Sequence, residues 1–173
     1  MIKSAVIIPT GDEIRSGVVQ DTDSAEVMRQ LVKLNPEIEV TRISPVNDEE
    51  EIIRRTILKM AEKAELIILI GGSGGGHRFS PTLGKDFTHT ALEDILPHST
   101  SSQLFGKNGH LWCKLVCGRL ENTLVINLPG PFTEAQAAME AFCRSVQSDD
   151  LTSINKAMAQ AVMAQYPTGA AIK

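Results

Sequence analysis

Three short apolar runs, separated by two helical patterns, constrain the fold of this chain more than any other feature. The runs are "SAVIIP" (residues 4–9), "IEVTRISPV" (38–46) and "LIILI" (66–70). The first and third are continuous and rich in β-branched residues, as is typical of strands buried on both faces. The order strand, helix, strand, helix, strand therefore predicts a parallel sheet with helices on its faces.

The segments between these runs have the periodicity of amphipathic helices. Residues 23–34 repeat apolar side chains at helical spacing, and Asp23 with Glu26 predicts a capping box at the start of that helix. The segment "NDEEEIIRRTILKMAEKAE" (47–65) carries one apolar stripe. Its glutamates fall in the first turn, where the helix dipole favours negative charge.

The second half of the chain predicts shorter elements. A short helix is expected over residues 90–96, and strands are expected at "HLWCKLVCG" (110–118) and "NTLVINL" (122–128). The few residues between these two strands suit a hairpin, which would add an antiparallel element to the sheet. Helices are expected at "PGPFTEAQAAMEAFCRSVQ" (129–147) and over residues 150–165.

Length and composition indicate one soluble, globular domain. The chain has 173 residues, 42% of them hydrophobic and 22% charged. We expect the domain to span residues 1–149, and the helix within 150–173 to pack on it or at a subunit contact.

Charge, apolar runs and cysteines limit the partners and the cellular location that we expect for the protein. The formal net charge of −4 argues against nucleic acid as a partner. No apolar run approaches the about 20 residues of a membrane helix. Three cysteines in a chain without a recognisable secretory leader predict a cytoplasmic location. The cysteines and the four histidines lack zinc-site spacing, so the cysteines are expected to be small buried residues.

The stretch "GGSGGG" (71–76) directly follows the third apolar run. At the carboxyl end of a central parallel strand, glycines let backbone N–H groups converge on an anion, usually a phosphate. The stretch is not a P-loop, because His77 and Arg78 follow its last glycine. It is not a Rossmann fingerprint either, because His77 or Phe79 takes the place of the third glycine. A flexible turn is the alternative reading.

Acidic residues gather in loops that should open on the same edge of the sheet. Candidates are Asp21 in the first loop, Asp48 before the second helix, and Asp86 after the glycines. Carboxylates near a phosphate make chemical sense when Mg²⁺ lies between them. Each candidate also has a structural alternative, as a turn residue or a helix cap. The turn "LPGPF" (128–132) opens a helix and is a second anion site in principle.

Five motifs follow one another along the chain: "PTGDEIRSGVVQDTDS", "ISPVNDEEEII", "ELIILIGGSGGG", "KDFTHTAL" and "VINLPGPFTEA". Their order resembles that of the molybdopterin-binding domain family, and the resemblance covers residues 4–142. That family includes molybdopterin adenylyltransferases, a domain of molybdenum insertases and gephyrin, and the competence-damage-inducible domain. The resemblance implies a three-layer α/β/α sandwich with a mostly parallel sheet. It also implies molybdopterin as ligand or substrate, with Mg²⁺ and ATP in the branch that transfers AMP.

The resemblance also implies roles for individual residues. Asp48 and Asp86 match the functional acids, as catalytic residues and Mg²⁺ ligands. The implied cofactor-binding residues are Thr10, Gly11, Asp21, Gly71, Gly72, Ser73, Gly74, Gly75, Thr88, Pro129 and Gly130. Related domains further imply a homo-oligomer, a trimer or dimer, and other molybdenum cofactor biosynthesis proteins as partners.

The chain departs from the family pattern at three places. Asp23 stands where the family usually has Asn, and Pro131 follows Leu-Pro-Gly where Asn or Ser is usual. After the glycines two registers compete. Residues 77–79 keep the family spacing but lose the acid, whereas residues 85–88 keep the acid and threonine but need an insertion. We prefer the second register, because "AL" (91–92) continues the pattern.

Three classes of function remain open at this point. The first is an enzyme of molybdenum cofactor synthesis, either a molybdopterin adenylyltransferase or a molybdenum-insertion-type transferase. The second is a non-catalytic protein that stores, delivers or senses the cofactor. The third is a nucleotide-processing enzyme like the competence-damage-inducible domain.

Overall fold

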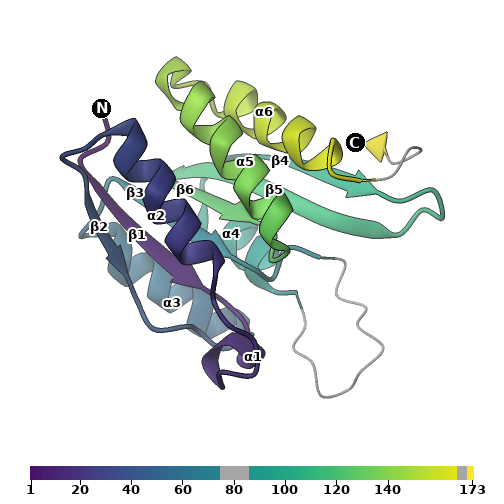
Figure 1. Ribbon diagram of the computed structural model, residues 1–173, viewed down its shortest axis with the longest axis horizontal. Coiled ribbons are helices and arrows are strands. Elements are labelled where there is room, and N and C mark those ends of the chain that lie inside the picture. Colours follow the sequence, from purple (N-terminus) through teal and green to yellow (C-terminus); the bar gives the residue numbers. More distant parts are fainter. Residues whose placement is uncertain (75–85, 167–170) are drawn as a thin grey trace.

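The computed structural model describes residues 1–74, 86–166 and 171–173. Within them, a seven-stranded sheet lies between two layers of helices (Figure 1). The strands are β1 (Ser4–Pro9), β2 (Glu39–Arg42), β3 (Leu66–Ile70), β4 (His98–Phe105), β5 (Leu111–Leu120), β6 (Thr123–Leu128) and β7 (Ala171–Ile172). The helices are α1 (Asp12–Arg15), α2 (Asp23–Leu34), α3 (Glu50–Ala61), α4 (Thr88–Ile95), α5 (Phe132–Ser145) and α6 (Leu151–Met163), with a 3₁₀ turn, η1, over Val146–Ser148. The predicted three-layer α/β/α fold is confirmed.

The strand order is β2-β1-β3-β6-β5-β4-β7. Strands β2, β1, β3 and β6 run parallel to one another, and β5 runs antiparallel to β6, as the predicted hairpin requires. Strand β4 is antiparallel to β5, so it points the same way as β6, and β7 is antiparallel to β4. The sheet is therefore mostly parallel, as predicted, although β4 and β7 were not expected from the sequence.

Alternate residues of the central strands enter opposite faces of the sheet. Ala5 and Ile7 of β1 belong to the core beneath α2, α5 and α6. Val6 and Ile8 belong to the core beneath α3 and α4. Every residue of β3 is buried in the same alternating way. The continuous apolar runs of the sequence arise because helices cover both faces.

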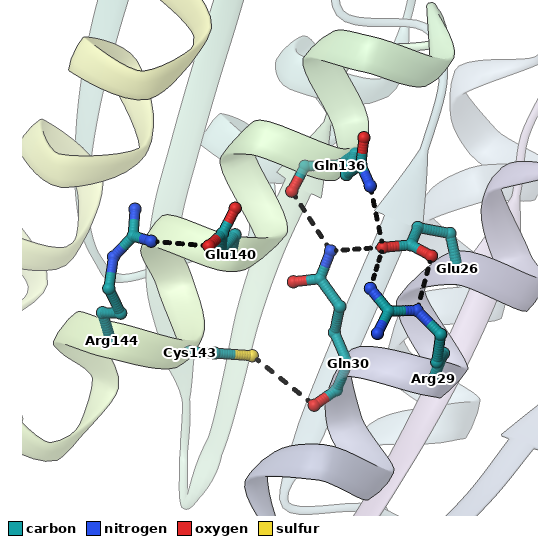
Figure 2. A network of polar contacts seen from close by, with 7 residues as sticks. All are labelled: Glu26, Arg29, Gln30, Gln136, Glu140, Cys143 and Arg144. Atoms are coloured by element: carbon teal, nitrogen blue, oxygen red, sulfur yellow. Dashed lines mark hydrogen bonds and ion pairs between the residues drawn. The ribbon is translucent and has the colours of Figure 1, made fainter.

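A polar network joins α2 to α5 (Figure 2). Its centre is Glu26 of α2, whose Oε1 accepts hydrogen bonds from Gln30 Nε2 (2.9 Å) and Gln136 Nε2 (3.3 Å). Arg29 donates to both oxygens of the same carboxylate. Chiefly because of the hydrogen bond from Arg29, the pKa of Glu26 falls to about 2. The network fixes these two helices against each other.

Helix α6 lies beside α5 and covers β4 and β5. Ile154, Met158 and Val162 of α6 are fully buried in the same cluster as Phe142 of α5. Asp150 caps the helix, because its side chain accepts hydrogen bonds from two backbone N–H groups of the first turn. The C-terminal helix thus packs on the sheet. In the part of the chain that is described, no helix has the length and apolar character to cross a membrane.

Candidate functional site

A cavity of about 480 Å³ opens at the carboxyl ends of β1, β3 and β6. Pro9, Ile70 and Pro129, which end or directly follow these strands, all line it. Strands β2 and β3 lie on opposite sides of β1, so the strand order reverses at this place. Ligands of open α/β sheets bind in crevices at such reversal points.

The cavity brings together most of the site residues predicted from the sequence. Those that line it are Thr10, Gly11, Asp21, Asp48, Gly71, Gly72, Ser73, Gly74, Asp86, Pro129 and Gly130. Thr88 does not line it but is completely buried directly behind Gly72. Gly75 lies outside the described residues, as do His77, Arg78 and Lys85. The ligand-binding roles of all these residues stay predictions.

The first residues of the glycine stretch enter the space between the ends of β6 and β5. The Gly71 N–H and the Ser73 hydroxyl both donate to the carbonyl oxygen of Leu128, at 3.1 and 3.0 Å. The Lys114 N–H of β5 donates to the Ser73 carbonyl oxygen at 2.7 Å. Ser73 is therefore buried, and its hydroxyl holds the loop in place.

Asn127 explains why β5 and β6 separate at this point. The β5–β6 pairing ends at Cys117 and Ile126. Beyond it, the Val116 N–H donates to Asn127 Oδ1 (2.6 Å), and Asn127 Nδ2 donates to the Lys114 carbonyl (2.9 Å). The buried amide thus replaces main-chain pairing, and the Lys114 N–H is left to bind Ser73.

Close packing behind the loop requires glycine. Gly71 and Gly72 have φ values of 100° and 62°, which favour glycine over other residues. A Cβ atom on Gly72 would also lie 2.2 Å from Thr88 Oγ1. The Thr88 N–H donates to the Gly72 carbonyl (3.1 Å), so this contact is fixed on the main chain as well. The backbone here is a tightly fitted segment and not a slack turn.

His89 of α4 supports the next part of the loop. Its Nε2 lies 3.1 Å from the Gly74 carbonyl oxygen, so the proton is on Nε2. Its Nδ1 is buried without a hydrogen-bond partner among the described residues. Burial lowers the pKa of His89, which is therefore neutral at pH 7. This positioning residue was missed in the sequence, where it looked like one of four scattered histidines.

The cavity is lined by carboxylates. They are Glu13, Asp21, Asp23, Asp48, Asp86 and Glu134, and no lysine, arginine or histidine is among the described lining residues. Asp86 packs against the loop, because a Cβ on Gly74 would lie 2.7 Å from its Oδ2. Asp48 does not cap α3, since Glu49 is the capping residue and no side-chain cap bond is made.

Asp21, and not Asp23, accepts the hydrogen bonds at the start of α2. Asp21 accepts hydrogen bonds from the Ser24 N–H (3.0 Å) and hydroxyl (2.6 Å), and pairs with Arg42 at 2.7 Å. Burial acts to raise the pKa of Asp21, but these hydrogen bonds outweigh it and lower the pKa. The capping box of Asp23 and Glu26 is wrong, because Glu26 binds its own helix and α5.

Asp23 is instead a poorly solvated carboxyl group in the cavity wall. Its Oδ1 is buried and has no hydrogen-bond partner among the described residues. Burial, and then the charge of Asp21, raise the pKa of Asp23 to about 6. The group is therefore charged at pH 7 at a cost in stability.

A cluster in the wall of the cavity was not predicted from the sequence. The chain's single tryptophan, Trp112, and its single tyrosine, Tyr166, meet edge to face with ring centroids 4.6 Å apart. The Tyr166 hydroxyl donates to Glu134 Oε2 at 2.9 Å. Burial raises the pKa of Glu134, and the hydrogen bond from Tyr166 opposes that shift. Trp112, Glu134 and Tyr166 come from β5, α5 and the segment after α6.

The described residues do not form a complete metal site on their own. In the described ranges, no group of three or more histidine, cysteine, aspartate or glutamate side chains is arranged to hold a metal ion. Mg²⁺, however, is usually held by one or two carboxylates together with phosphate oxygens and water. Asp48 and Asp86 both line the cavity and carry carboxylate oxygens, the donor type that Mg²⁺ takes.

Comparison with known proteins yields a family and a set of relatives. The family described as "Probable molybdopterin binding domain" matches residues 6–148. A protein of Halothermothrix orenii named "Putative competence-damage inducible protein" is 30% identical over 135 residues. The match covers 78% of this chain but 26% of that protein, so the chain spans about a quarter of its relative.

Solved structures show the same fold. The molybdopterin biosynthesis enzyme MoaB of Thermus thermophilus matches with a TM-score of 0.66 and 22% identity, covering 90% of this chain and 98% of that one. The molybdopterin biosynthesis Mog protein of Mycobacterium ulcerans matches with a TM-score of 0.65 and 22% identity, covering 88% and 99%. At this level of identity the likeness concerns the fold alone.

Proposed function

Since the chain belongs to the molybdopterin-binding domain family, we propose that it binds molybdopterin in the cavity at the carboxyl edge of its sheet. The observation that carries the proposal is the glycine loop. Gly71, Gly72 and Gly74 bring bare backbone to the cavity, and Thr88 packs directly behind Gly72. Such backbone suits the close approach of a phosphate. The volume of about 480 Å³ suits a small organic ligand.

The carboxylates of the cavity make a metal ion part of the proposal. Six of them line it, and carboxylate oxygens are ligands that Mg²⁺ takes together with phosphate oxygens. We assign Asp48 and Asp86 to hold Mg²⁺ that enters with phosphate groups. The ion would neutralise phosphate charge, and both carboxylates would orient it.

The enzymatic form of the proposal is adenylyl transfer. A phosphate oxygen of molybdopterin forms a bond to the α-phosphorus of ATP, and the bond from that phosphorus to the α,β-bridging oxygen breaks, releasing pyrophosphate. No covalent bond to the protein is needed. The loop N–H groups would hold phosphate oxygens in line, and Asp48 and Asp86 would keep the metal where charge develops.

The test measures binding and turnover together. Purified protein is incubated with molybdopterin, with and without Mg-ATP, and bound ligand and adenylylated product are quantified. Asp86→Asn and Asp48→Asn are expected to lower turnover by about 100-fold, because the metal loses an anionic ligand. Asp94→Asn, on the exposed side of α4, is the matched control and should leave turnover unchanged.

Each other outcome has its own meaning. Unchanged turnover in Asp86→Asn would remove Asp86 from the catalytic role. Affinity without turnover in the wild type would make the protein a binder that stores, delivers or senses the cofactor. Absence of binding in both conditions would contradict the enzymatic and the binding forms of the proposal.

The relative from Halothermothrix orenii favours a second candidate, a nucleotide-processing enzyme. It is 30% identical over 78% of this chain and is named for competence damage. The same loop and carboxylates would then bind a Mg²⁺-nucleotide without any pterin. Incubation with Mg²⁺ and nucleoside diphosphate derivatives distinguishes the two, because turnover without molybdopterin supports only this candidate.

A further inference from the structure

We propose that Trp112, Glu134 and Tyr166 form a subsite for the ring of the ligand, and that this subsite selects fused rings with a 2-amino-4-oxopyrimidine edge, as in pterin. The inference rests on the proposed function, because it takes the glycine loop as the phosphate end of the cavity. The inference adds the orientation of the ligand in the cavity and the carboxylate that forms hydrogen bonds to its ring.

The first support is the aromatic wall. Trp112 and Tyr166 line the cavity and brace each other edge to face, at an interplanar angle of 73°. Gly106 packs against the indole, since a Cβ there would lie 2.5 Å from Trp112. Both rings are therefore held before any ligand enters. Rigid aromatic surface suits a planar heteroaromatic ring, which gains stacking energy at little entropic cost.

The second support is the hydrogen-bonding chemistry of Glu134. A carboxylate has two acceptor oxygens and binds best to two adjacent N–H donors. The Tyr166 hydroxyl binds Oε2 and fixes the orientation of the group. Within the described residues, Oε1 accepts no hydrogen bond, and Oε2 has a second lone pair. Pterin presents its N3–H and 2-amino group side by side, which matches this pair of acceptors.

The third support is the spacing between the ring subsite and the glycine loop. The Lys114 N–H binds the Ser73 carbonyl of the glycine loop. Trp112 precedes Lys114 by two residues on β5, which corresponds to about 7 Å along a strand. Cys113, between them in sequence, lines the same cavity. The ring subsite and the loop are therefore neighbours, as the two ends of a phosphorylated pterin require.

Trp112 makes the test direct, because it is the chain's only tryptophan and its fluorescence reports on this subsite. The probes are 6-hydroxymethylpterin phosphate and the matching lumazine, in which an oxo group replaces the 2-amino group. Inorganic pyrophosphate is the probe without a ring. All titrations contain Mg²⁺. The wild type should bind the pterin at least tenfold more tightly than the lumazine.

Glu134→Gln is the informative variant, because its amide oxygen still accepts from Tyr166 while its NH₂ opposes the donors of the ring. It should bind the pterin at least tenfold more weakly, lose the preference over lumazine and keep its pyrophosphate affinity. Tyr166→Phe should lose a smaller part of the preference. Glu140→Gln, on the exposed side of α5, is the control and should behave as wild type.

Three results would overturn the assignment: no preference for pterin in the wild type, an intact preference in Glu134→Gln, or an equal loss of pyrophosphate affinity in that variant. The two proposals fail separately. If Glu134→Gln binds molybdopterin as tightly as wild type does, the ring subsite is wrong and the proposed function stands. If the wild type selects the pterin probe but does not bind molybdopterin, the proposed function is wrong.

Discussion

The hydroxyl groups of Thr10 and Thr88 lie 3.2 Å apart, buried behind the glycine loop. The Thr10 hydroxyl donates to the Ile70 carbonyl at 3.1 Å, so the Thr88 hydroxyl is the donor to Thr10. The Thr88 N–H also donates to the Gly72 carbonyl. Two side chains thus join the segment after β1, the end of β3 and the start of α4 beneath one cavity.

Thr88→Val should weaken this junction without changing its shape. Valine is close in size but cannot donate to Thr10, so we expect a loss of about 1 kcal/mol in the free energy of unfolding. Ligand affinity should fall several-fold as the loop loosens. Urea unfolding and ligand titration measure the two effects. Thr56→Val, which also loses a hydroxyl hydrogen bond, here a partly buried one to the Ile52 carbonyl, should lower stability without changing affinity. Unaltered stability of Thr88→Val would show that the bond has no net value.

Gly72→Ala should lower stability by more than the positive φ of Gly72 alone predicts. Gly17 is a matched control, because its φ of 78° is also positive but a Cβ there would meet nothing within 4 Å. Gly17→Ala should cost about 1 kcal/mol, as is usual at positive φ. Gly72→Ala adds a contact of 2.2 Å with Thr88 Oγ1, so we expect about 1–3 kcal/mol more. Equal thermal stability of the two variants would mean that Thr88 moves away freely.

The central strands could be predicted from sequence because burial on both faces leaves a local signal. The run "SAVIIP" matches β1 residue for residue, and "LIILI" matches β3. Strand β4 has no such signal, because its sequence is "HSTSSQLF" and much of it is exposed. It becomes a strand only by pairing with β5 along its length, which is a tertiary effect.

The distinction between local sequence signals and tertiary contacts also explains which site residues could be predicted. Parallel strands place their following loops at one edge, so the glycines and the acids Asp48 and Asp86 could be grouped in advance. Glu134 and Tyr166 are 32 residues apart in sequence, on different elements, and only the packing of α6 beside α5 brings them together. No short motif records such a contact.

Removal of divalent metal should abolish tight binding of phosphate-bearing ligands. Six carboxylates line the cavity, and Mg²⁺ bridges carboxylate and phosphate oxygens, so we expect a divalent cation to strengthen phosphate binding. With EDTA in place of Mg²⁺, we expect the dissociation constant for phosphorylated pterin or pyrophosphate to rise at least tenfold. Affinity for an unphosphorylated pterin should change little. The same dissociation constants with EDTA as with Mg²⁺ would show that the protein's own cations balance the phosphate charge.

Asp23→Asn should stabilise the protein at neutral and alkaline pH. The pKa of Asp23 is raised from 3.8 to about 6, first by burial and then by Asp21. The folded state therefore binds a proton more tightly than the unfolded state, and stability falls as pH rises from about 4 through 6. Because solvent partly screens this half-buried group, we expect a gain of about 1 kcal/mol at pH 8.

The pH dependence of the stability gain shows whether the gain comes from removing the charge of Asp23 or from another effect of the substitution. The difference between wild type and Asp23→Asn, measured by urea unfolding, should shrink as pH falls from 6 and disappear well below pH 3.8, where Asp23 is protonated in both states. Glu62→Gln, at an exposed position after α3, should show no such dependence. A constant difference from pH 4 to 8 would mean that the charge of Asp23 is not its cause.

Asp21→Asn should lower the free energy of unfolding at neutral pH, whereas Asp23→Asn should raise it. Although burial acts to raise the pKa of Asp21, hydrogen bonds from Ser24 and Arg42 lower it below 3.8, so the charged form stabilises the fold. This contribution is present above pH 3.8 and is lost as pH falls through the folded-state pKa. Its side chain is 10% exposed, so its bond to Arg42 is only partly screened. We expect a loss of about 1–2 kcal/mol in the free energy of unfolding at pH 7, which shrinks in acid.

Asp149→Asn, which breaks an ion pair whose acidic side chain is 78% exposed, should cost far less in the same unfolding experiment. Equal costs for the two variants would show that burial adds nothing to the Asp21–Arg42 pair.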